Sequence, residues 1–143
     1  MQLSAQDKKL VSTIESEHIA LSEIISQISS VMGSHSDDPE KVSDFIDEFI
    51  TLLGEHFKHE EEMMNEKSYP DQENHHLSHE HVLNYLSDYS RLYKNGMIAT
   101  NVDSGFQLRV WLNLNIYRGD KDFDEWLKKQ KFNTWLNTRE TIN

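Results

Sequence analysis

Apolar stripes with helical spacing constrain the fold of this chain more than any other feature of its sequence. Hydrophobic residues recur at steps of three and four in four long segments, which is the spacing of one face of an α-helix. No segment shows the period of two that is typical of a β-strand. The stripe of the first segment, at about residues 4–32, consists of Leu10, Ile14, His18, Leu21, Ile25, Ile28 and Met32. The pattern predicts an all-α protein.

The other three segments carry stripes of the same kind. The second opens at Asp38-Pro39, where a capping residue precedes a proline at the first helical position, and the third runs from about Pro70 to Asn95-Gly96. Their inward positions are Val42, Phe45, Phe49, Leu53, His56, Glu60 and Met64, then His75, His79, Val82, Leu86, Tyr89 and Tyr93. The fourth starts near Asp103 and continues past a break expected near Gly119. Its inward positions are Phe106, Leu108, Trp111, Leu112, Asn115, Phe123 and Trp126.

Long helices with short connections favour one architecture. Only five glycines and two prolines interrupt the 143 residues, and four amphipathic helices in sequence favour an up-down-up-down antiparallel four-helix bundle. Ser4 and Asp7 have the spacing of a capping pair at the first helix. We expect a single domain over residues 1–143, with the bundle at about 4–131. In the tail at 132–143, Phe132, Trp135 and Leu136 predict a short C-terminal helical extension.

Charge and composition exclude several classes of function. The chain has 14 Lys and Arg against 25 Asp and Glu, a net charge of −11, which argues against nucleic acid or an anionic membrane as partner. The absence of cysteine excludes disulfides, iron–sulfur ligation and thiol catalysis. No apolar run has the length of a signal sequence or a membrane span. We expect a cytoplasmic protein, with the choice between monomer and homo-oligomer left open.

Five polar residues interrupt the apolar stripes: His18, His56, Glu60, His75 and His79. Each costs roughly a few kcal/mol if it is buried without a partner. Residues four apart on a helix are separated by about 40°, so each spaced pair aims at one point. Imidazoles and a carboxylate that converge from different helices form a ligand set suited to iron, zinc or manganese.

Each polar position also has a simpler interpretation. A lone inward histidine is more often a hydrogen-bonded core residue, and one spaced pair on a helix is compatible with a solvated face. Convergence from three helices favours the metal site over coincidence. The remaining histidines, which lie off the stripes and are expected at the surface, are His35, His59, His76 and His81.

Taken together, these residues resemble the signature of the hemerythrin family from about Ile14 to Phe123. The family pattern IDxQHxxL is similar to Ile14–Leu21, with two conservative departures. HFxxEExxM is matched by His56, Phe57, Glu60, Glu61 and Met64, and YPxxxxHxxxH by Tyr69, Pro70, His75 and His79. WLxxHIxxxD is matched by Trp111, Leu112, Ile116 and Asp120, but Asn115 stands where the family has its fifth histidine.

The resemblance implies a cofactor of two iron ions, cycling between Fe2+ and Fe3+, with an oxo or hydroxo bridge and dioxygen as ligand. Carried over by position, Glu60 and Asp120 would bridge the irons. His18 and His56 would hold the iron with the open position, and His75 and His79 the other. The oxygen pocket would be lined by Leu21 and Leu112.

The main departure from the family pattern is Asn115 in the fourth helix, at the position of the fifth histidine. An amide oxygen is a weaker ligand than an imidazole, so water would complete the second iron. Residues 115 and 120 are five apart, about 140° on an ideal helix, so facing both inward requires local widening or an end of the helix.

Three functions follow from these interpretations. Dioxygen binding for storage, delivery or sensing is the leading one. An oxidase or peroxidase acting at the iron opened by Asn115 is the alternative, although the stripes show no inward acid or base beyond the ligands and no obvious substrate cavity. The third is a metal-binding module that has lost oxygen carriage.

Overall fold

The computed structural model describes residues 4–33, 39–98, 102–117 and 121–130. Its elements are α1 (Ala5–Gly33), α2 (Pro39–Glu66), α3 (Gln72–Lys94) and α4 (Val102–Leu112), which passes directly into a π-helical turn, η1 (Asn113–Tyr117). Residues 121–130 are also helical, and no described residue is in a β-strand, which confirms the all-α prediction. The predicted tail helix with Phe132, Trp135 and Leu136 lies outside the described residues.

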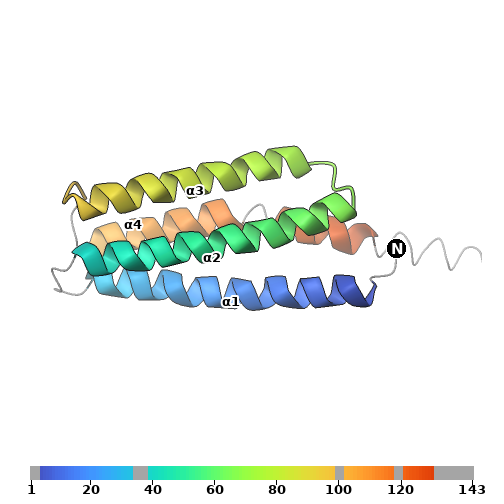
Figure 1. Cartoon of the computed structure of the whole chain (residues 1–143), viewed down its shortest axis with the longest axis horizontal. Helices are drawn as coiled ribbons and strands as arrows, with labels where there is room; N and C mark the ends of the chain where they lie inside the picture. The colour runs from blue at the N-terminus through green and yellow to red at the C-terminus, as the bar shows by residue number, and fades with distance from the viewer. Residues whose placement is uncertain (1–3, 34–38, 99–101, 118–120, 131–143) are drawn as a thin grey trace, which may run out of the picture.

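The four helices lie side by side along one long axis, and each runs opposite to the one before it (Figure 1). Helix α1 packs against α2 and α4, α2 packs against α3, and η1 contacts α3. This arrangement is the predicted up-down-up-down bundle. Within the described residues, none of the helices combines the length and apolar character that a membrane span requires.

The start of α1 is closed by the predicted capping pair. The Ser4 backbone N–H donates to Asp7 Oδ2 and the Asp7 N–H donates to Ser4 Oγ, both at 3.0 Å. Reciprocal bonds of this kind satisfy two of the backbone donors that a helix start leaves open. Lys67 Nζ lies 2.6 Å from Asp7 Oδ2. The cap therefore also ties the start of α1 to the segment that follows α2.

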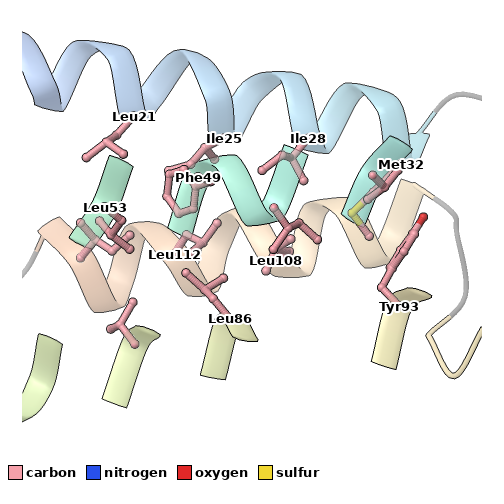
Figure 2. Packing of buried hydrophobic residues seen from close by; sticks show 14 of the residues in the cluster. Leu21, Ile25, Ile28, Met32, Phe49, Leu53, Leu86, Tyr93, Leu108 and Leu112 are labelled. Atoms are coloured by element: carbon pink, nitrogen blue, oxygen red, sulfur yellow. The ribbon is translucent and has the colours of Figure 1, made fainter. Parts of the chain in front are cut away.

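Two clusters of buried side chains fill the interior. The larger one draws on all four helices and includes Leu21, Ile25, Ile28, Met32, Phe49, Leu53, Leu86, Tyr93, Leu108 and Leu112 (Figure 2). The smaller one consists of Met63, Met64, Tyr69 and Phe123. On α1 and α2, the polar residues His18 and Glu60 lie in sequence between the contributions to the two clusters. The bundle thus places its polar residues between two apolar layers.

The predicted inward position of Phe106 is wrong, because this side chain is 64% exposed. Gly105 occupies the inward position instead. A Cβ at Gly105 would lie 3.1 Å from the Ser29 backbone oxygen and 3.3 Å from Met32 Cβ, so α1 and α4 approach closely there. Neighbouring residues on a helix differ by about 100° in direction. The close contact at Gly105 therefore turns Phe106 toward solvent.

Candidate metal centre

The carboxylate of Glu60 lies at the centre of four imidazoles. His56 Nε2 is 2.5 Å and His18 Nε2 is 3.7 Å from Glu60 Oε1. His75 Nε2 is 3.4 Å and His79 Nε2 is 3.8 Å from Glu60 Oε2. One oxygen thus faces imidazoles from α1 and α2, and the other faces two imidazoles from α3. The bundle brings together all five polar residues of the stripes.

These residues form two groups that share Glu60. The first is His18, His56 and Glu60, the second is Glu60, His75 and His79, and in each the ligand atoms lie within 4.8 Å of one another. Imidazole nitrogen and carboxylate oxygen suit iron and other divalent transition metals. Either group could hold a metal ion, and Glu60 would be a ligand in both cases.

Burial provides an independent test of this fit at His79. Its side chain is 7% exposed, and neither ring nitrogen has a hydrogen-bond partner among the described residues. Burial lowers the pKa of His79 to about 3, although the Glu60 carboxylate acts in the opposite direction. The ring is therefore neutral near pH 7, which is the form that binds a metal. A cation would satisfy a nitrogen whose burial is otherwise costly.

The fourth helix departs from ideal α-helical geometry close to residues 115–120, where the sequence predicted local widening or an end of the helix. The π-helical turn η1 provides local widening at 113–117, slightly before Gly119. Asn115 lies within this turn, and it is exposed rather than inward because its Nδ2 donates to the Trp111 backbone oxygen at 2.8 Å. Asp120 lies outside the described residues, so its bridging role stays a prediction.

Glu17 supports the outer nitrogen of His56 and was not identified from the sequence. Its Oε1 lies 3.4 Å from His56 Nδ1 and 3.0 Å from His59 Nδ1. A carboxylate at this nitrogen leaves Nε2, on the other side of the ring, to face Glu60. His59 is 28% exposed, so its predicted surface position holds only in part.

Glu61 lies near the outer nitrogen of His79, as Glu17 does near that of His56. Its Oε2 is 3.6 Å from His79 Nδ1, and its other oxygen contacts His76 Nδ1. The Glu61 carboxylate raises the pKa of His76, and Glu80 acts in the same direction. His76 and His81 are exposed as predicted, and His35 lies outside the described residues. The sequence did contain one indication of these roles. Glu17 is next to His18 and Glu61 is next to Glu60 in the chain, so each carboxylate can reach the neighbouring helix.

The structure contains a cavity that was not apparent from the sequence. A cavity of about 430 Å³ lies between α1, α2 and the helical residues 121–130, and His18 and Glu60 belong to its lining. Leu21 and Leu112 do not line it. They are 2% and 1% exposed within the larger apolar cluster, so their role in an oxygen pocket stays a prediction.

Comparison with known families gave a match over most of the chain. The family model described as the hemerythrin HHE cation binding domain matches residues 9–120, which include Glu60 and the four histidines that face it. Comparisons with curated proteins and with solved structures gave no match.

Proposed function

Because this chain belongs to the hemerythrin HHE cation-binding domain family, we propose that it holds two iron ions at Glu60 and uses them to bind dioxygen reversibly. One observation carries the proposal. Each oxygen of a single buried carboxylate faces two imidazoles, so the chain offers two adjacent positions of similar composition. A mononuclear site would need only one of them.

The residues around Glu60 perform distinct tasks in this proposal. Glu60 supplies negative charge between the two positions, and the imidazoles would act as neutral nitrogen donors once a metal is bound. The apolar clusters on either side keep water from the buried rings of His56, His75 and His79, which strengthens the electrostatic interactions there. Ferrous iron held there would supply the electrons for taking up dioxygen and recover them on its release. Glu17 and Glu61 hold the outer side of the site.

Anaerobic reconstitution with ferrous iron tests the proposal. We expect up to two irons per chain by metal analysis, and an optical spectrum that changes when dioxygen is admitted and reverts when it is removed. A chain that retains no iron under these conditions would contradict the whole proposal. Iron binding followed by an irreversible spectral change would support the metal site but contradict reversible binding of dioxygen.

Asn115 favours a second candidate function, an oxidase or peroxidase. Its side chain is turned to the Trp111 backbone oxygen, so the position at His75 and His79 has one protein donor fewer than the family pattern. A metal with fewer protein ligands keeps a place for an exchangeable molecule. Sustained turnover of peroxide by the iron-loaded chain would support this candidate. Tight zinc binding without redox activity would instead favour a metal-binding module.

A further inference from the structure

A cavity opens at the most exposed edge of the described metal centre. It lies between α1, the end of α2 and residues 121–130, and its volume is about 430 Å³. The side chain of His18, which lines it, is 29% exposed, whereas the other three imidazoles facing Glu60 are at most 7% exposed. A molecule that approaches the centre from this side therefore passes through the cavity.

The walls of the cavity are mainly apolar and come from separate elements. Val11 and Ile14 come from α1, and Phe123 and Leu127 from the helical residues 121–130. All four belong to or pack against the smaller apolar cluster. His18 and Glu60 add polar atoms at the metal centre. A pocket with apolar walls and a few convergent polar groups is typical of sites for small organic molecules.

The charged residues of the lining disfavour an anion. Lys121 is accompanied by the carboxylates of Glu15, Asp124 and Glu60, so negative charge is in excess. The cavity is also much larger than a diatomic gas requires. Such a molecule is similar in size to water, and one water molecule takes up roughly 30 Å³ in the liquid. Its volume falls within the range of about 300–1,000 Å³ found for small-molecule pockets.

We propose that this cavity binds a small, largely apolar organic molecule that carries no negative charge, beside the metal centre. The apolar walls provide the contact area, and the polar atoms of the lining adjoin one side of the bound molecule. Binding in the cavity does not require a metal. Contact between the bound molecule and a metal ion rests on the function proposed above.

Calorimetric titration of the full chain with indole and with cyclohexanol tests the proposal. One probe is aromatic and the other aliphatic, and both are uncharged with one hydroxyl or N–H group. We expect saturable binding of at least one probe at one site per chain. Ile14→Trp fills the cavity and should weaken binding at least tenfold. Ile19→Trp is the matched control, because Ile19 is on the same helix, does not line the cavity and is 64% exposed.

Circular dichroism establishes that each variant is folded, and Leu127→Trp replaces Ile14→Trp if the latter does not fold. Absence of saturable binding of both probes to the unsubstituted chain would overturn the proposal, as would equal binding by the filled variant. A parallel titration uses the chain loaded with Co2+, whose visible spectrum should change as the probe binds. If the unsubstituted chain binds the probe but does not bind Co2+, the result contradicts the metal site and supports the cavity site.

Discussion

At the scale of single residues, Glu17 should determine how His56 presents its inner nitrogen. The Glu17 carboxylate lies at His56 Nδ1, on the side of the ring away from Glu60. Loss of an outer partner of a metal-binding histidine typically weakens metal binding by about 10–100-fold. We expect Glu17→Ala to lower Co2+ affinity by this factor. Glu17→Gln should retain most of it, because the amide oxygen also accepts a hydrogen bond.

Competition with a chromophoric chelator measures both affinities, and the visible Co2+ spectrum reports any change in ligand geometry. The control is Glu23→Ala, an exposed position on the same helix. Equal affinity and an unchanged spectrum in Glu17→Ala would show that His56 is oriented by its packing alone.

Asp7 supports a prediction on the pH dependence of stability. Its hydrogen bond with Lys67, followed by that with the Ser4 backbone, lowers the pKa of the Asp7 carboxyl below the ordinary 3.8. The carboxyl therefore stabilises the fold above pH 3.8, and this stabilisation is lost as the pH falls through the folded-state pKa. We expect Asp7→Asn to lower the free energy of unfolding by about 0.5–1 kcal/mol at pH 7, because the amide keeps an acceptor for the Ser4 N–H but loses the charge that pairs with Lys67.

Thermal denaturation at a series of pH values tests this expectation. The difference between Asp7→Asn and the unsubstituted chain should shrink below pH 3.8. Glu15→Gln, an exposed change on the same helix, should show no such trend. A difference that is constant with pH would assign the effect to packing rather than to charge.

Residues at the metal centre were predictable from the sequence to the extent that they interrupt an apolar stripe. His18, His56, Glu60, His75 and His79 were identified in this way, and the structure brings them together. Glu17 and Glu61 lie in the segments that resemble the family, but no role was predicted for them because they are one position off the stripe, where a carboxylate is usually solvated. Their contacts depend on how neighbouring helices are rotated, and periodicity within one helix does not contain that information.

At the scale of elements, two glycines in helices should respond to substitution in opposite directions. Gly54, in α2, has nothing within 4 Å of the position of an added Cβ, whereas Gly105 meets the Ser29 backbone oxygen at 3.1 Å. We expect Gly54→Ala to raise the free energy of unfolding by up to about 1 kcal/mol through helix propensity. Gly105→Val should lower it by about 1–3 kcal/mol through overpacking between α1 and α4.

Chemical denaturation of the two variants provides the measurement, and each serves as the control for the other. Stabilisation by Gly105→Val would mean that α1 and α4 separate without cost, contrary to the close approach at Ser29.

The elements themselves were largely predictable, because caps and turn residues mark their ends. α2 begins at Pro39 as expected, and α3 ends at Lys94, two residues before Gly96, whose φ of +73° favours glycine. Which face of α4 points inward was not predictable, because either Phe106 or Gly105 is compatible with the spacing of the inward residues. Only contact with α1 distinguishes the two residues. The exposed position of Asn115 was not predictable either, because the residue lies in a π-helical turn, where the spacing of a regular α-helix does not apply.

At the scale of the whole molecule, metal binding should be coupled to the stability of the bundle. The residues around Glu60 come from α1, α2 and α3, so the complete ligand set exists only in the folded chain. A ligand that binds only the native state stabilises it by about 2.7 kcal/mol at a hundred times its dissociation constant. For a chain of this size that corresponds to a rise in Tm of roughly 5–10 °C. Removal of the metal by a chelator should reverse the rise.

Glu60→Ala tests whether the coupling runs through the shared carboxylate. Each of its oxygens faces two imidazoles, so its loss affects both groups of ligands at once. We expect the variant to keep the helical fold but to lose most of the metal-dependent rise in Tm. His81→Ala, an exposed change on α3, should retain the full rise. If Glu60→Ala responds to metal like the unsubstituted chain, the ions bind elsewhere. If neither chain responds, the buried imidazoles are held by the protein alone, and the stability of the bundle is independent of the metal.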